Sequence, residues 1–196
     1  MRIIAGTFRS RALQAPPGMA TRPSSDRLRE TLFNVLAPRI AGVRFLDLYA
    51  GSGAVGIEAL SRGAAHVTFV ERAPAALKAL RANLDRLGIT EGFRIHATSV
   101  SSFLRKPRTG AVGLDAGFSI VFLDPPYDAA EEYAAVLGLL GGASAGLLAE
   151  GAVAIAEHRR KDRLAERYGC LERTRLLEQG DAALSFYAAR AAAEPE

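Results

Sequence analysis

The 196-residue sequence predicts an α/β fold in which an open, mostly parallel sheet carries helices on both faces. Short apolar runs typical of strands alternate with longer stretches whose apolar residues recur at helical spacing. A glycine-rich turn follows the first buried run and opens a helix, as in folds that bind a ligand at their strand tips. The last two strand-like runs are joined by a short turn at Gly180-Asp181. This final pair must be antiparallel, because a parallel crossover needs about a dozen residues.

A small extension is expected before the sheet. Short apolar pieces at 2–5 and 11–14 predict a hairpin or two edge strands. A helix is predicted next, with Ser25 as its N-cap, an apolar stripe at helical spacing and an end at Pro38. We therefore expect residues 1–40 to form a basic hairpin-and-helix extension.

The main domain is expected at 41–190, followed by a frayed tail at 191–196. Pro74 in a first turn and Gly88 after a last turn bound the clearest helix. No helix is predicted for 98–104, which is expected to contact a bound base. The other elements follow from the same patterns, with strands at 43–49, 66–70, 93–97, 118–123, 153–156, 171–177 and 183–190, and helices at 54–62, 74–87 and 129–140.

Basic residues are concentrated at the start of the chain. The net charge is +4, yet residues 1–44 contain eight arginines and two acids and so carry +6. Arginine pairs with phosphate through two hydrogen bonds, so this excess indicates a nucleic-acid partner. A solvated surface without a partner remains the alternative explanation of the charge.

Cysteine, histidine and hydropathy patterns exclude several classes of protein. The single Cys170 cannot form an internal disulfide, which fits a reducing, cytoplasmic location. The histidines at 66, 96 and 158 show no metal-ligand spacing. No apolar run reaches the ~18 residues that a membrane span needs. We therefore expect neither a metal nor a membrane partner.

Polar residues follow four of the predicted strands. Asp47, Glu71, Ser99 and Asp124 each stand at a strand end. Because the carboxyl ends of parallel strands meet at one edge of a sheet, one ligand could touch all four. Glycines at 51, 53 and 56 are expected to let the backbone approach that ligand closely. Glu71, about 20 residues after the glycine turn, is placed to accept hydrogen bonds from ribose hydroxyls.

The stretch Asp124-Pro125-Pro126-Tyr127 predicts chemistry on an amine. Two prolines remove two backbone donors, which leaves a stiff loop whose carboxylate and carbonyl only accept hydrogen bonds. Such a corner suits an exocyclic amine of a nucleobase, and Tyr127 could stack on that base once it is unpaired. The acids around it favour a cationic methyl donor, S-adenosylmethionine. The expected reaction is direct in-line transfer, catalysed mainly by positioning.

These stretches resemble a known family. Asp47-Leu48-Tyr49-Ala50-Gly51-Ser52-Gly53 is similar to the first motif of class I S-adenosylmethionine-dependent methyltransferases. Asp124-Pro125-Pro126-Tyr127 is similar to the Asn/Asp-Pro-Pro-Tyr/Phe motif of those that methylate amino groups. More specifically, the chain resembles the bacterial RsmD-type 16S ribosomal RNA guanine-N2 methyltransferases, and the segments that carry this resemblance are Arg2–Gly6, Arg22–Asn34, Gly56–Ala64 and Gly180–Tyr187.

The resemblance implies a Rossmann-like, seven-stranded sheet of order 3-2-1-4-5-7-6 with the last strand antiparallel. It implies methylation of the N2 amine of one guanine in 16S rRNA, or in the assembling small subunit. Nothing in the sequence suggests more than a monomer. The catalytic residues would be Asp124, Pro125, Pro126 and Tyr127. The cofactor would contact Asp47, Tyr49, Ala50, Gly51, Ser52, Gly53, Glu71, Arg72, Ser99, Val100 and Asp124, and RNA would contact Arg9, Arg11, Arg22, Arg27 and Arg29.

The sequence departs from the family pattern at one cofactor position. Many relatives carry Asp where Ser99 stands, and that Asp binds the adenine amine. A serine has a shorter reach and no charge, so the backbone N–H of Val100 is expected to share the adenine contact. Ser24-Ser25 replaces two threonines and keeps both hydroxyls.

Four other functions fit the sequence less well. A nicotinamide-dependent oxidoreductase lacks support, since no catalytic Tyr-Lys or Cys-His arrangement is visible. Amino-group methyl transfer to a DNA base or to a protein glutamine amide would use the same chemistry; Asp124 in place of Asn and the basic first segment favour RNA. A non-enzymatic RNA-binding module would need no acidic pocket.

Overall fold

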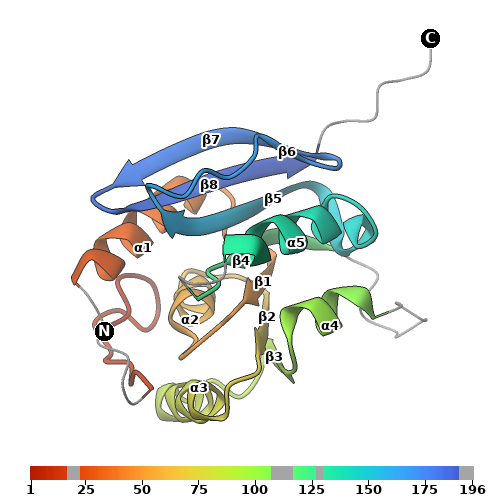
Figure 1. Cartoon of the computed structure of the whole chain (residues 1–196). Coiled ribbons are helices and arrows are strands. Elements are labelled where there is room, and N and C mark those ends of the chain that lie inside the picture. The colour runs from red at the N-terminus through yellow and green to blue at the C-terminus, as the bar shows by residue number, and fades with distance from the viewer. Residues whose placement is uncertain (17–22, 107–116, 127–129, 190–196) are drawn as a thin grey trace.

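The computed structural model describes residues 1–16, 23–106, 117–126 and 130–189. Within them, one eight-stranded sheet has the order β3-β2-β1-β4-β5-β8-β7-β6 (Figure 1). The first five strands are parallel, and β6, β7 and β8 join antiparallel. The strands are β1 (Arg44–Leu48), β2 (His66–Glu71), β3 (Phe93–Ala97), β4 (Phe118–Leu123), β5 (Leu148–Arg159), β6 (Arg167–Tyr168), β7 (Leu171–Gln179) and β8 (Ala182–Ala189).

Helices cover both faces of the sheet, so the predicted α/β class is confirmed. Helices α1, α2 and α3 lie on one face, whereas α4 and α5 lie on the other (Figure 1). Their bounds are α1 (Pro23–Leu36), α2 (Ala54–Ser61), α3 (Pro74–Leu87), α4 (Val100–Arg105) and α5 (Ala130–Leu140), with a 3-10 turn η1 at Ala145–Leu147. No helix among the described residues has the length and apolar character needed to span a bilayer.

Strand side chains alternate between two hydrophobic cores, because successive residues of a strand point to opposite faces. Phe45 of β1, Phe122 of β4 and Ile155 of β5 belong to the core beneath α1, α2 and α3. Leu46 and Leu123 belong to the core beneath α4 and α5. This alternation fixes which residues beyond the strand ends continue each face.

Most strand and helix positions agree with the sequence predictions, and α3 and β4 agree to the residue. The predicted order 3-2-1-4-5-7-6 holds for the seven long strands. The expected count of seven was wrong, because the two-residue β6 pairs with the start of β7 and adds an eighth. That strand is too short to leave an apolar pattern in the sequence.

Three local predictions need correction. Helix α1 begins at Pro23, so Ser25 lies inside the helix rather than at its N-cap; proline is favoured at a first helical position. Residues after Ser99 form α4, because Ser99 itself caps a helix there. The expected first hairpin is present but shorter than predicted, with one antiparallel bridge, Arg2↔Ala12, and backbone hydrogen bonds from Ile3 to Arg11 and from Leu13 to Met1, both of 3.0 Å. The tail at 191–196 and most of the connection at 106–117 lie outside the described residues.

The first segment, residues 1–16, is hydrogen-bonded to α2 rather than paired with a strand of the sheet. The buried Glu58 carboxylate accepts the backbone N–H groups of Ile4 at 2.7 Å and Ala5 at 3.0 Å. Gly6 has φ +84°, and a Cβ there would stand 1.8 Å from the Ser61 carbonyl oxygen, so only glycine allows this approach. The segment therefore packs as part of the core beneath α1, α2 and α3.

Candidate active site

The acids predicted at strand ends lie on one face of the sheet. Asp47 follows Phe45, Glu71 follows Phe69 and Asp124 follows Phe122, each by two residues, and these phenylalanines share the core beneath α1, α2 and α3. The three carboxylates therefore continue that face at the carboxyl edge of β2, β1 and β4. The structure brings them together, and Asp124 and Glu71 both raise the pKa of Asp47.

Asp47 is buried within this cluster. Its side chain is 2% exposed, and its Oδ2 accepts the backbone N–H of Gly56 at 2.9 Å, in the first turn of α2. Burial raises the pKa of Asp47 to about 7, and the hydrogen bond from Gly56 opposes that rise. The carboxyl thus binds the glycine turn to β1 while titrating near neutrality.

Glu71 is held by backbone alone. Its Oε2 accepts the N–H of Gly51 at 2.9 Å, and its Oε1 accepts those of Arg72 at 2.7 Å and Ala73 at 2.8 Å. These bonds fix the carboxylate between the glycine turn and the start of α3 without any cation. The Arg72 side chain is exposed.

The glycines of the turn do different jobs. Gly51 has φ +56°, and a Cβ there would meet only the Tyr49 carbonyl oxygen at 4.0 Å, which leaves open space for a ligand. A Cβ at Gly53 would stand 2.3 Å from Leu80 Cδ1, and one at Gly56 would stand 2.2 Å from Phe69 Cε1. Gly53 and Gly56 thus also make room for α3 and β2, and their close approach to a ligand stays a prediction.

The other residues of the turn are constrained by the fold. Tyr49 adopts φ +61°, which is strained for a residue with a side chain, and its hydroxyl donates to Glu132 of α5. Ala50 and Ser52 are buried, and the Ser52 carbonyl accepts a hydrogen bond from the Asn83 amide at 3.0 Å. Asn83 also bonds the backbone of Gln14, so the first segment braces the turn.

Asp124 and its prolines follow β4 directly. Asp124 keeps part of its surface exposed, Pro125 is buried and Pro126 is exposed. Burial raises the pKa of Asp124 to about 7. No ion pair joins Asp47, Glu71 or Asp124 to a Lys or Arg among the described residues. Tyr127 lies outside those residues.

Ser99 stands at the carboxyl end of β3 and caps α4. Its Oγ accepts the backbone N–H of Ser102 at 3.2 Å and donates to the Ser102 hydroxyl at 2.8 Å. Val100, the first residue of α4, is 5% exposed. The Ser99 hydroxyl is thus already engaged, and the adenine contact of Ser99 and Val100 stays a prediction.

Glu157 is a fourth acid at this edge of the sheet, and it was not predicted from the sequence. Glu157 continues β5 two residues after Ile155, which lies beside Phe122 of β4. It is half-buried; burial and the nearby Asp124 raise its pKa well above the ordinary value, while Arg29 lowers it. The signal was present, since Glu157 follows the apolar run 153–156 just as Asp124 follows β4.

The arginines predicted to bind RNA lie in different surroundings. Arg9, Arg11 and Arg27 are exposed, and Arg22 lies outside the described residues. Arg29 is only 5% exposed; its Nη2 donates to the Arg2 carbonyl at 2.7 Å and to Asp26 at 3.0 Å. Arg29 therefore braces α1 against the first segment instead of facing solvent.

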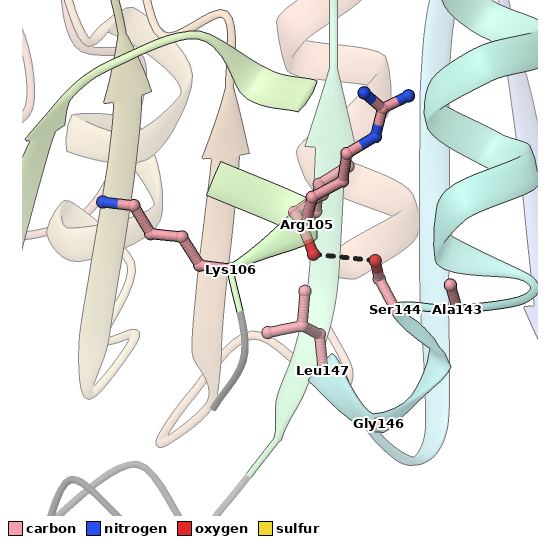
Figure 2. Close-up of a pocket in the computed structure, with 7 residues that line it drawn as sticks. Arg105, Lys106, Ala143, Ser144, Gly146 and Leu147 are labelled. Carbon is pink, nitrogen blue, oxygen red and sulfur yellow. Dashed lines mark hydrogen bonds between the residues drawn. The ribbon is translucent and has the colours of Figure 1, made fainter. Parts of the chain in front are cut away.

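Figure 2 shows a cavity that none of these acids lines. It has a volume of about 440 Å³ and is lined by the end of α4, including Arg105 and Lys106, and by the turn around Ser144. Leu147, which lines the cavity, directly precedes β5, and Leu148 pairs with Phe118 at the start of β4. The cavity therefore lies at the amino ends of these strands, whereas the acids lie at the carboxyl ends. Among the described residues, no three His, Cys, Asp or Glu side chains gather to hold a metal ion.

Comparisons with known proteins agree with this arrangement. Residues 1–188 match the family model described as conserved hypothetical protein 95. The Bacillus subtilis (strain 168) protein named "Putative rRNA methyltransferase YlbH" is 37% identical over 190 residues, which cover 97% of this chain and all of that protein.

Two further comparisons concern Escherichia coli. The ribosomal RNA small subunit methyltransferase D of strain K12 is 43% identical over 127 residues, which cover 65% of this chain and 60% of that protein. The solved structure of yhhF superposes with a TM-score of 0.82 at 34% identity and covers 96% of this chain and 97% of that one.

Proposed function

Since the chain belongs to the conserved hypothetical protein 95 family of RsmD-type methyltransferases, we propose that it methylates the exocyclic N2 amine of a guanine in small-subunit ribosomal RNA, with S-adenosylmethionine as donor. One observation carries the proposal. The glycine turn and the Asp124-Pro125-Pro126 corner follow adjacent strands, and their carboxylates lie on the same face. The proposed substrate is 16S rRNA, free or within the assembling small subunit.

The residues around the turn fit the proposed donor. Asp47, Glu71 and Asp124 form an acidic cluster that no Lys or Arg of the described residues neutralises by an ion pair. A ligand with a sulfonium and an ammonium group supplies the missing positive charge. Gly51 leaves open space over the backbone, and Glu71 is already fixed by three N–H groups, as binding a ribose requires.

When bound, S-adenosylmethionine supplies an electrophilic methyl group. The protein's part is to hold the amine in line with it, which is worth several kcal/mol when the reacting atoms are aligned. Asp124 Oδ and the Pro125 carbonyl accept the two N–H bonds of the amine, and Pro126 keeps the corner stiff. With a pKa of about 7, Asp124 is ionised in part at neutral pH and can take up the proton that the amine releases.

The RNA would approach over the first segment and α1. The exposed Arg9, Arg11 and Arg27 are free to contact phosphates, and the first 44 residues carry a net charge of +6 whereas the whole chain carries +4. Arg9 lies near the C-terminal end of α2, since its neighbour Phe8 donates to Ser61, and so contacts RNA at a distance from the reacting base. The names of the relatives support ribosomal RNA over DNA or protein.

The test is mass mapping of methylated nucleosides in small-subunit rRNA from cells with and without this enzyme. We expect one N2-methylguanosine to disappear when the enzyme is removed and to return when the wild-type gene is restored. An unchanged rRNA methylation pattern, or a new methyl group on DNA or on a protein glutamine instead, would contradict the proposal.

A further inference from the structure

Glu157 lies beside the proposed catalytic acid. Strands β4 and β5 are parallel and pair Phe122 with Ile155 and Leu123 with Ala156. The next position along both strands places Asp124 next to Glu157, about 4.8 Å apart between strand axes. Both acids continue the rows that face α1, α2 and α3, so both carboxylates lie on the same side of the sheet.

Among the described residues, no side chain forms a hydrogen bond or ion pair with the Glu157 carboxylate. Arg29 is close enough to lower the pKa of Glu157, yet its Nη2 is bound to Asp26 and to the Arg2 carbonyl. No ion pair or side-chain hydrogen bond of Glu157 is formed with another described residue. Its backbone is held instead, because the Tyr133 hydroxyl donates to its carbonyl at 2.8 Å.

Arg29 adds a second unusual group to the same place. Its side chain is 5% exposed, and its Nε has no hydrogen-bond partner among the described residues. Burial and Asp124 raise the pKa of Glu157 more than the buried Arg29 guanidinium lowers it, and a donor that binds the carboxyl favours its ionised form. Two carboxyl groups whose oxygens can accept hydrogen bonds, Asp124 and Glu157, therefore stand side by side at the mouth of the site.

We propose that Glu157 reads the identity of the target base by accepting the N1–H of guanine while Asp124 accepts the adjacent N2 amine. This inference rests on the proposed function. Guanine presents N1–H and the N2 amine next to each other on its Watson–Crick edge, so the two carboxylates match a row of donors. A base with an unprotonated N1 turns a lone pair toward Glu157 and is repelled.

The inference is tested with a base that keeps the amine and loses the N1 proton. Small subunits are reconstituted with rRNA carrying either guanine or 2-aminopurine at the mapped position, and kcat/KM is measured for each. The wild-type enzyme should prefer guanine by about 100-fold, in line with one lost buried hydrogen bond and one repulsive contact. Glu157→Gln, whose amide can donate to an unprotonated N1, should shrink that preference at least about tenfold.

Matched variants separate base reading from folding. Glu150→Gln changes an exposed acid on the same strand and should leave both rates unchanged. Glu157→Asp keeps the carboxylate and should keep the preference for guanine at a lower rate, so a poorly folded Glu157→Gln does not remove the test. S-adenosylmethionine affinity, measured by calorimetry, should be the same in all three variants.

The outcomes are distinct. A guanine preference in Glu157→Gln within about twofold of wild type would overturn the role of Glu157. Loss of the guanine preference in Glu157→Asp, with wild-type cofactor affinity, would overturn the requirement for a carboxylate. Wild-type enzyme that methylates neither substrate would overturn the proposed function itself.

Discussion

At the scale of single residues, four carboxylates at one edge of the sheet differ in what surrounds them. Glu71 accepts three backbone N–H groups, and Asp47 accepts the N–H of Gly56 in the first turn of α2. Asp124 and Glu157 lie side by side, each with a raised pKa. The first two acids therefore shape the turn, whereas the second two have oxygens to offer a substrate.

Replacing Asp124 should stop the reaction without unfolding the protein. Asp124→Ala removes the proposed acceptor of the amine, and we expect a loss of at least about 100-fold in kcat. Thermal unfolding should change little, because removing a buried charge relieves a desolvation cost. Asp85→Ala, at an exposed position on α3, is the control. Normal turnover by Asp124→Ala would remove Asp124 from the mechanism.

The two arginines of α1 should respond differently to the same substitution. Arg27→Ala removes an exposed charge and should weaken RNA binding, lowering the slope of log affinity against log salt by about one, with unchanged stability. Arg29→Ala leaves the Arg2 carbonyl without its donor and should cost about 1–3 kcal/mol of unfolding free energy.

Filter binding across salt concentrations and urea unfolding distinguish the two arginines. An Arg29→Ala protein of wild-type stability would contradict the bracing role of Arg29. An Arg27→Ala protein whose salt dependence equals that of wild type would contradict the phosphate contact of Arg27.

At the scale of elements, close packing of α2 on β2 positions the glycine turn. Gly56 lies against Phe69 and Val67 of β2, and Asp47 accepts its N–H. The helix can approach the sheet this closely only because Gly56 has no side chain. The geometry of the site thus depends on the packing of Gly56 against β2.

Gly56→Ala should be destabilising. Its Cβ would stand 2.2 Å from Phe69 Cε1 and 2.8 Å from Val67 Cγ1, both in a fully buried strand, so overpacking should cost about 1–3 kcal/mol. Gly138→Ala is the matched control in α5, where a Cβ meets nothing within 4 Å. It should stabilise by up to about 1 kcal/mol through helix propensity. Urea unfolding would contradict this if the two variants changed stability alike.

The sequence predicted the elements whose signals are local. Apolar runs and caps located β3, β4 and α3 to the residue, and acids after such runs located Asp47, Glu71 and Asp124. The burial of Arg29 could not be predicted from the sequence, because it depends on how α1 packs. Its hydrogen-bond acceptor is a backbone carbonyl 27 residues away. The short β6 and the role of Gly56 also depend on neighbours that are distant in sequence.

At the scale of the whole molecule, the buried acids at the carboxyl edge make the free energy of unfolding depend on pH. Asp47 and Asp124 have pKa values of about 7, raised by burial from 3.8. The folded protein therefore binds protons more tightly than the unfolded chain between about pH 4 and pH 7. Stability from these groups is present at low pH and is lost as the pH rises through 7.

Asp47→Asn isolates this effect. The neutral amide keeps an acceptor for Gly56 and carries no buried charge, so the variant should be more stable than wild type at pH 8. The stability difference should shrink by up to about 1.4 kcal/mol for each pH unit between 7 and 4, as the wild-type carboxyl takes up its proton. Urea unfolding at pH 8, 7, 6 and 5 measures it. Parallel curves for the two proteins would contradict the raised pKa.

The first segment and α1 form hydrogen bonds with residues that are synthesised much later. Ile4 and Ala5 bond Glu58, which is 54 and 53 residues later in the chain, and Gln14 bonds Asn83, which is 69 residues later. Thr31 of α1 bonds Gln179, which follows after 148 residues. The partners of residues 4, 5 and 14 therefore lie in the first half of the sequence, whereas α1 also bonds a residue of the last strand pair, so the first segment can pack on α2 and α3 before α1 gains its contact with β7.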